Sequence, residues 1–397
     1  MSSVPVPKPL ETPGGARLKS IDLLRGAAAL GVVVHHSVNA GATPPETAHW
    51  FPTVSAIADR GRLGVPLFFV ISGFCIHARW ARQRAAGVDE RLDFGRFWRR
   101  RLYRLYPPYL VALTLSMGLI LLAYLAGKSS GGLEHYPDPK LRWMGMDAVA
   151  HVLMLHGFYP VFDRAGGNAP FWTLAREEYF YILYFPLLAF RRRLGLPLSL
   201  GGVLLLGLAF PVVLSPWAVP GTGWGDLVQS SSITLWFQWC LGMLAVEGWC
   251  GLIVLPRWCG SLWAAALWAG AASVTQGRWE AFSPSLWGMA FFTLLNAGLW
   301  AEQRGHWPQT RLVRWLEGVG LFSYSLYLIH HPVRGILKRV LERLIVSGSP
   351  VKYAAATVLV VVGGYIAGKM FFWAVEKRFL HAPILKAPAL PVPNLSS

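Results

Sequence analysis

Long apolar runs recur along the chain and are separated by short, Arg-rich polar segments. The runs are continuous and do not alternate, which is typical of buried helices rather than half-buried strands. Several approach or exceed the roughly 20 residues that a helix needs to cross a bilayer, and in lipid only helices and closed barrels satisfy their backbone. The pattern predicts an all-α polytopic membrane protein with about ten transmembrane helices. The expected spans are approximately 21–40, 63–79, 105–127, 172–190, 196–216, 231–249, 261–276, 283–301, 316–333 and 354–375.

A further stretch, "MDAVAHVLMLHGFYPVF" at 146–162, is shorter and less apolar, and it decides the topology of everything after it. If it does not cross, there are about ten spans and both termini are cytoplasmic. The basic clusters then all lie inside: 96–104, 191–193, 304–314 and 377–386. If it crosses, two of those clusters move outside. The Lys/Arg distribution favours ten spans, with 146–162 re-entrant or at the outer surface. Four basic residues would then be external: Arg334, Lys338, Arg339 and Arg343.

Composition supports the membrane interpretation. Charged residues make up 14% of the chain, against about 25% in soluble domains. The net charge of +17 comes from basic residues between the apolar runs, where cytoplasmic loops collect Lys and Arg, so nucleic-acid binding is not expected. The four cysteines form no CxxC pair, and neither a disulfide framework nor a metal site is predicted.

The two ends of the chain differ from its middle in composition. Both are rich in Pro and small residues, and the beginning is polar, so no cleavable signal peptide is visible. We expect disordered tails at 1–16 and 381–397 and a single transmembrane domain at 17–380.

The first apolar run, "LLRGAAALGVVVHHS" at 23–37, contains Arg25, His35 and His36. An ionisable group inside a transmembrane helix costs about 2.5–3.5 kcal/mol on insertion scales and marks a functional site by default. Arg25 and His36 are eleven residues apart, which is close to three turns and roughly 16 Å along one helix face. His35 points away from that face.

Ionisable groups recur in two later runs. Glu177 and Glu178 occur in "FWTLAREEYFYILYFP", and His330 and His331 occur in "FSYSLYLIHHP". A carboxylate and imidazoles from different helices can form the base and orienting group of general base catalysis. The alternative is that Arg25 extends to lipid phosphate and the histidines make packing hydrogen bonds between helices.

A second polar feature is "FWRRRLYRLYPPY" at 97–109, on the side expected to be cytoplasmic. Guanidinium groups bind phosphate bidentately and the neighbouring Trp98 and Tyr103 can stack on a base. The alternative is an anchor that contacts anionic lipid headgroups. The arginines of this cluster are Arg99, Arg100, Arg101 and Arg104.

Five motifs follow one another in order between residues 21 and 332, and the resemblance that they carry covers residues 18 to about 378. They are "IDLLRGAAALGVVVHH" at 21–36, "FFVISGFCI" at 68–76, "RRRLYRLYP" at 99–107, "WTLAREEYFY" at 172–181 and "SYSLYLIHHP" at 323–332. Together they resemble the acyltransferase family 3, membrane acyltransferases that modify surface glycans and other acceptors. The chain departs from the family pattern at Thr173, where Ser is usual, and at Pro66. The secreted SGNH-type esterase domain of some members is absent, which implies direct transfer or a separate periplasmic partner.

The resemblance implies transfer of an acyl group, expected to be acetyl, from cytoplasmic acyl-CoA to a hydroxyl of a glycan, lipid-linked sugar or similar acceptor. It selects His36 as general base or transient acyl carrier, and Glu177 to orient an imidazole or bind the acceptor. Arg25 and the four clustered arginines would bind acyl-CoA, a co-substrate rather than a tightly bound cofactor. Supporting or substrate-binding roles fall to the remaining matched residues: His35, Ser72, Gly73, Trp172, Tyr181, Tyr324 and His330. The expected location is a cell membrane, in bacteria the inner membrane.

Two other functions remain open at this stage. Intramembrane Arg, Glu and His also suit a proton-coupled carrier of acyl groups or other solutes, although no internal repeat supports a transporter built from inverted halves. A structural or signalling subunit would use the same polar groups to bind partners. The acceptor, the acyl chain length and the oligomeric state are not readable from the sequence.

Overall fold

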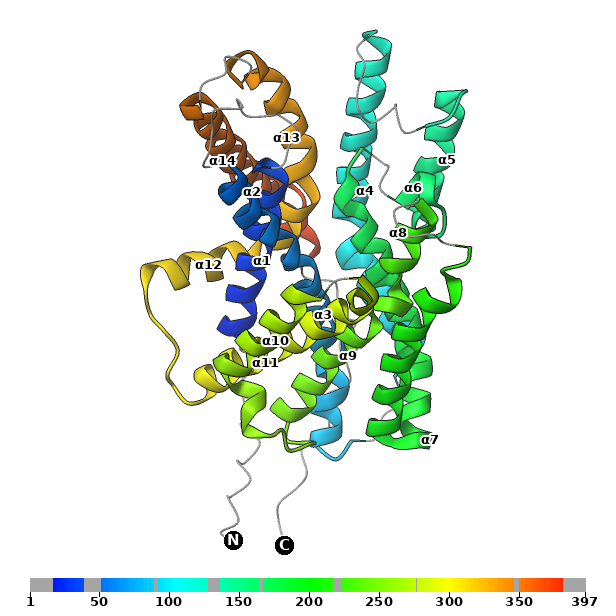
Figure 1. Ribbon diagram of the computed structural model, residues 1–397, viewed down its shortest axis with the longest axis vertical. Coiled ribbons are helices and arrows are strands. Elements are labelled where there is room, and N and C mark those ends of the chain that lie inside the picture. Colours follow the sequence, from blue (N-terminus) through cyan, green and yellow to red (C-terminus); the bar gives the residue numbers. More distant parts are fainter. Residues whose placement is uncertain are drawn as a thin grey trace, which may run out of the picture.

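The computed structural model describes residues 17–38, 51–88, 92–127, 136–163, 167–217, 223–275, 277–345 and 350–380. Every regular element within these ranges is a helix, as the apolar pattern predicts (Figure 1). The tails expected to be disordered, 1–16 and 381–397, lie outside the described residues.

Five helical stretches of the described chain are long and apolar enough to cross a membrane: Lys19–Val38, Pro52–Ala85, Phe94–Leu125, Ala169–Leu214 and Val351–Ala374. They contain helices α1 (Lys19–Val38), α3 (Gly64–Ala85), α4 (Phe94–Leu125), α7 (Trp172–Leu214) and α14 (Pro350–Ala374). A polytopic helical membrane protein is therefore supported. The count of about ten spans and the cytoplasmic position of both termini stay predictions.

The 43-residue α7 contains two of the expected spans in one assigned helix. Gly195 has φ 79° and ψ 171°, a conformation in the positive-φ region that favours glycine, and it interrupts the helical backbone. The chain turns back at Gly195. A hydrogen bond shows this, since Nε of Arg176, near the start of α7, donates at 2.7 Å to the carbonyl oxygen of Ser230, which follows the end of α7. The two halves match the spans predicted at 172–190 and 196–216.

Other predicted spans do not form as single long helices. The expected span 316–333 is broken at Phe322, between α12 (Arg311–Leu321) and α13 (Ser323–Ile345). Helix α12 is amphipathic and lies across α1 in Figure 1. The span expected at 261–276 is α10 (Leu262–Val274), whose 13 residues reach only about 20 Å.

Segment 146–162 is also divided. It contains the end of α5 (Lys140–Val152), the 3-10 turn η3 (His156–Phe158) and α6 (Pro160–Asp163). The 13 residues of α5 are too few to cross the roughly 30 Å hydrocarbon core as one helix. This agrees with the expectation of a segment that does not span.

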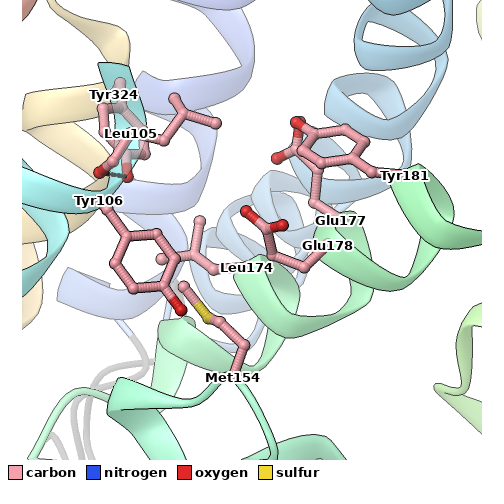
Figure 2. A pocket seen from close by; sticks show the side chains of 8 residues that line it. All are labelled: Leu105, Tyr106, Met154, Leu174, Glu177, Glu178, Tyr181 and Tyr324. Carbon is pink, nitrogen blue, oxygen red and sulfur yellow. Dashed lines mark hydrogen bonds between the residues drawn. The ribbon is translucent and has the colours of Figure 1, made fainter. Parts of the chain in front are cut away.

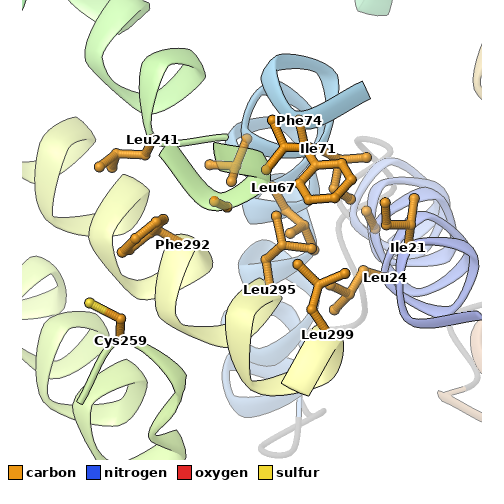
Figure 3. Close-up of a cluster of buried hydrophobic side chains, with 14 of the residues drawn as sticks. Ile21, Leu24, Leu67, Ile71, Phe74, Leu241, Cys259, Phe292, Leu295 and Leu299 are labelled. Carbon is orange, nitrogen blue, oxygen red and sulfur yellow. The ribbon is translucent and has the colours of Figure 1, made fainter. Parts of the chain in front are cut away.

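The core lies where α1, α3, α9 (Ser232–Trp249) and α11 (Ser283–Gln303) meet (Figure 3). Its labelled residues include Ile21, Leu24, Leu67, Ile71, Phe74, Leu241, Phe292, Leu295 and Leu299. The start of α1 is tied to the end of α11, since the Glu302 carboxylate accepts from the backbone N–H groups of Lys19 and Ser20 at 2.9 and 3.0 Å. These bonds satisfy two of the donors that every helix N-terminus leaves open.

Glycines allow α3 and α9 to approach closely. A Cβ at Gly73 would collide with the Trp239 carbonyl, and a Cβ at Gly242 would collide with the Val70 carbonyl. Small residues at such contacts are the usual means of close helix packing in membranes. Gly73 therefore sets the distance between two helices, and the adjacent Ser72 faces a polar cavity.

Candidate functional site

Two imidazoles from distant parts of the sequence meet at the end of α1. Nδ1 of His36 lies 3.0 Å from Nε2 of His330 on α13, and the ring centroids are 5.2 Å apart. Nδ1 of His330 faces the carbonyl oxygens of Tyr327 at 2.8 Å and Leu326 at 3.1 Å. The ring of His330 is buried and fixed by its own helix, so it forms a rigid partner for His36.

Two further histidines surround this pair. The ring centroids of His35 and His331 lie 5.0 and 5.7 Å from that of His36. Nδ1 of His35 is 3.5 Å from the carboxylate of Asp59, which places this ring toward α2 (Phe51–Asp59). Nη1 of Arg334 donates to Nε2 of His331 at 3.2 Å. We call His35, His36, His330 and His331 the imidazole cluster.

A cavity of about 180 Å³ lies beside the cluster and contains most of the other predicted site residues. Arginines come from α1 and α4, and Glu177 comes from α7. The predicted residues that line it are Arg25, Ser72, Arg101, Arg104, Glu177, Tyr181 and Tyr324. We call it the donor cavity, after the acyl-CoA donor expected from the sequence, because its arginines are suited to phosphate groups.

Only part of the arginine cluster faces this cavity. Arg101 and Arg104 line it, whereas Arg99 and Arg100, on other sides of α4, do not. The guanidinium of Arg101 lies 5.5 Å from the Phe97 ring centroid and 5.7 Å from that of Tyr181, within cation–π range.

The aromatic side chains near these arginines have other partners. The ring of Trp98 packs with Phe97 and Tyr181, and that of Tyr103 contacts Phe379. Trp172, at the start of α7, lies 5.9 Å under the Arg176 guanidinium and does not line the cavity. Trp98, Tyr103 and Trp172 therefore do not line the donor cavity.

Glu177 is held in the donor cavity rather than against an imidazole. Its Oε1 accepts from Ser72 Oγ at 2.7 Å and from the Tyr181 hydroxyl at 2.5 Å. Trp239 Nε1 donates to Ser72 Oγ at 3.3 Å, so α9 also helps to position the serine. Of the two roles predicted for Glu177, this arrangement favours contact with a bound substrate over orientation of His36, whose partner is His330.

A second, much smaller cavity adjoins the first (Figure 2). Its volume of about 20 Å³ is enough for one water molecule. Figure 2 shows the carboxylates of Glu177 and Glu178 beside each other, with Tyr106 and Met154 at the opposite wall. The Tyr324 hydroxyl donates to the Leu105 carbonyl at 2.9 Å, which fixes α13 against α4 at this point.

Tyr327 lies between the donor cavity and the imidazole cluster. It lines the cavity, and its ring centroid is 5.8 Å from that of His330 and 5.9 Å from that of Phe68. Its hydroxyl is 2.8 Å from Thr173 Oγ1 and donates to the Pro170 carbonyl at 3.0 Å. Thr173, the departure from the family pattern, thus keeps the hydroxyl function of the usual Ser.

Sequence reasoning missed several cavity residues, including Tyr327, Cys75 and Glu376. Glu376 follows α14 in the turn η7 (Glu376–Phe379), and its Oε2 accepts from the Ser325 backbone N–H at 3.0 Å. Burial raises the pKa of the Glu376 carboxyl, while Ser325 and the charge of Arg25 act in the opposite direction. In the sequence, the only feature that could have pointed to Glu376 is its position as an acidic residue just after the last apolar run.

A second buried group of histidines lies outside both cavities. The rings of His151 and His156 stack at 3.9 Å, and Nδ1 of His151 is 2.9 Å from Asp147. Burial lowers the pKa of His156 well below its usual value. Within the described ranges, no group of three or more His, Cys, Asp or Glu side chains is arranged to hold a metal ion.

Comparison with known proteins identifies the family. The acyltransferase domain matches residues 18–369, nearly the whole chain, and the protein belongs to this family. Peptidoglycan O-acetyltransferase OatA of Listeria monocytogenes is 26% identical over 401 residues, covering 92% of this chain and 56% of the relative. The putative peptidoglycan O-acetyltransferase YrhL of Bacillus subtilis is 28% identical over 177 residues, covering 42% of this chain and 23% of the relative.

O-acetyltransferase OatA of Staphylococcus aureus is also 28% identical over 177 residues, covering 42% of this chain and 24% of the relative. The chain thus spans about half the length, or less, of these curated relatives. No solved structure matches the protein.

Proposed function

We propose that the protein is a membrane O-acyltransferase that moves an acyl group, expected to be acetyl, from acyl-CoA to a hydroxyl of a glycan or similar acceptor. The observation that carries this proposal is the donor cavity, which is lined by Arg25, Arg101 and Arg104 and is separated from the His36–His330 pair by Tyr327. Membership of the acyltransferase family and the names of the relatives support the same reaction class.

The arginines account for the donor. Acyl-CoA carries phosphates, and guanidinium groups bind phosphate with charge-assisted, often bidentate hydrogen bonds. In the predicted orientation this end of the cavity faces the cytoplasm, where acyl-CoA resides. The pantetheine arm would then extend along the cavity past Ser72 and Glu177 toward Tyr327. Tyr327 separates the cavity from His330, so its ring must turn before a thioester can reach His36.

The hydrogen bonds of His330 determine which nitrogen of His36 is basic. Carbonyl oxygens only accept, so Nδ1 of His330 carries a hydrogen and Nε2 of the neutral ring carries a lone pair. Nδ1 of His36 then donates to that lone pair. Nε2 of His36 is left with its own lone pair, which suits a general base.

The reaction balances with these groups alone. Nε2 of His36 takes the proton of the acceptor hydroxyl while the oxygen attacks the thioester carbonyl carbon. The carbon–sulfur bond then breaks, and the CoA thiolate leaves with the proton that His36 returns. His330 stays neutral and keeps the ring in place, and Glu177 contacts the bound substrate.

Purified protein in detergent tests this function against the carrier alternative. With radiolabelled acetyl-CoA and a soluble glycan acceptor, an enzyme forms labelled ester, whereas a carrier needs two compartments and forms none. His36→Gln should lower turnover by about 100-fold or more, the usual contribution of a general base. His306→Gln, at an exposed site, is the matched control. Full turnover by a folded His36→Gln protein would sink the assignment of the base.

A further inference from the structure

Arg334 is a partly buried guanidinium without a carboxylate partner. It lies on α13 one turn beyond His330, and within the described part of the chain it makes one hydrogen bond, from Nη1 to Nε2 of His331. Its Nε is buried and has no partner. No ion pair in the described part of the chain includes Arg334. Burying an ionised group without such pairing is unfavourable, so this arrangement calls for a ligand.

Two other enclosed arginines find their partners within the protein. Arg176 donates to the carboxylate of Asp163 at 2.6 Å and to the carbonyl oxygens of Gly157 and Ser230. Arg191 forms a two-point ion pair with the buried carboxylate of Glu247. Arg334 differs because no group in the described ranges bonds to its Nε or Nη2.

Arg334 is linked through His331 to His36, the proposed base. Nη1 of Arg334 is bonded to His331, whose ring centroid is 5.7 Å from that of His36. The carboxylate of Asp59 is 3.5 Å from His35, on the other side of the imidazole cluster. Arg334 is also the first of the basic residues that break the predicted accumulation of Lys and Arg on the inner side. A binding role near His36 would account for a basic residue at this position.

We propose that Arg334 binds an oxyanion of the acceptor, a carboxylate or a phosphate, and so places a neighbouring hydroxyl at Nε2 of His36. This inference rests on the proposed transferase function and narrows its acceptor to an anionic molecule. The Nε–H and Nη2–H groups are parallel and fit two oxygens of one oxyanion. A bound anion also offsets the repulsion between Arg334 and the imidazolium that His36 becomes when it takes up a proton.

Binding tests the site without turnover. The probes are a disaccharide with one uronate carboxylate, the methyl ester of that disaccharide, and a disaccharide without a carboxylate that carries a 1-phosphate group. Wild-type protein should bind the uronate or the phosphate at least about tenfold more tightly than the ester, the scale of a charge-assisted hydrogen bond. Arg334→Gln should remove this preference and Arg334→Lys should keep part of it. Arg339→Gln, at an exposed position of the same helix, should leave it unchanged.

Equal binding of the three probes by wild-type protein would overturn the proposal, whether or not any variant folds. Comparison of the uronate with the 1-phosphate shows which oxyanion the site prefers, and a preference for either one supports the proposal.

Turnover then links the site to the reaction. Arg334→Gln should lower kcat/KM for the anionic acceptor by about tenfold or more. It should change kcat/KM for the methyl ester by no more than about threefold and leave KM for acyl-CoA unchanged. Equal losses with both acceptors would mean a structural role and overturn the proposal. The same assay is repeated in lipid vesicles with and without phosphatidylglycerol. A turnover rate that depends on phosphatidylglycerol would also overturn the proposal, since Arg334 would then be binding a lipid headgroup. If wild-type protein acylates no acceptor, the proposed function fails, while the binding preference still judges the anion site.

Discussion

The hydrogen bond made by one ring nitrogen of a histidine determines which nitrogen is free to act as a base. For His36 that acceptor is Nε2 of His330, and no carboxylate takes this place. The neutral pair avoids burying an ion, which is expensive in a membrane protein. In the proposed mechanism His330 is therefore a positioning residue for His36.

Replacing His330 separates this role from simple packing. His330→Leu removes the acceptor for Nδ1 of His36, so kcat should fall by about 100-fold with KM for acyl-CoA unchanged. His330→Gln restores a carbonyl oxygen and should recover part of the loss. Nitrogen NMR of ¹⁵N-histidine-labelled protein provides an independent readout, in which His36 should be protonated at Nδ1 in the wild type and shift toward the other tautomer in His330→Leu. Equal kcat for the Leu and Gln variants would contradict a positioning role.

The donor arginines make a separate prediction. Arg101→Gln removes a charge that lines the cavity, so KM for acetyl-CoA should rise by about 10- to 100-fold, the range of hydrogen bonds to charged groups. Arg192→Gln changes an exposed basic residue outside the cavity and is the control. The measurement is initial rate against acetyl-CoA concentration at saturating acceptor. A change in kcat alone would argue against a donor-binding role.

The site could be predicted only as far as helical spacing reaches. Arg25 and His36 are both on α1, and the three-turn rule places them on one face without any knowledge of the fold. The contact of His36 with His330 joins residues 294 positions apart, and no periodicity reveals it. For the same reason the family resemblance could name Glu177, Ser72 and Tyr181 as site residues, while the hydrogen bonds that join them are evident only in the packed helices.

At the scale of elements, the predicted spans succeeded where apolar runs are bounded by strong breaks. Gly195 separates the halves of α7 where the sequence has three arginines, and both halves agree with the prediction. The prediction failed at 316–333, because an apolar window cannot distinguish one helix from two that meet at an angle. Helix α12 packs on α1 through Gly26 and Gly320, whose neighbours leave no room for a Cβ.

The contact between α3 and α9 offers a test of element packing. Gly73→Ala places a methyl group against the Trp239 carbonyl, and overpacking of this kind typically costs about 1–3 kcal/mol. Because Ser72 is adjacent and bonds Glu177, activity should fall together with Tm. Gly118→Ala in α4, where no atom lies within 4 Å of an added Cβ, should leave Tm unchanged or raise it. Thermal unfolding in detergent compares the two, and equal Tm values would show that the close approach is not required.

At the scale of the whole molecule, the site depends on nearly the entire chain. The donor cavity takes Arg25 from the first helix and Glu376 from the turn after the last one, with α3, α4, α7 and α13 between them. Both ends of the cavity therefore form only when the full helical domain has assembled. The orientation of this domain in the membrane determines which face the donor cavity meets.

Orientation can be measured at two positions that the first half of α7 separates. Phe158 in η3 and Arg192 at the turn before Gly195 are both exposed. The predicted span at 172–190 lies between them, so we expect them to face opposite sides. The distribution of Lys and Arg predicts Arg192 inside. A membrane-impermeant maleimide should modify Phe158→Cys in intact cells and Arg192→Cys only after permeabilisation, each above the background of the native cysteines. The reverse labelling would place the arginines of the donor cavity on the outer side, away from cytoplasmic acyl-CoA, and would count against the proposed donor.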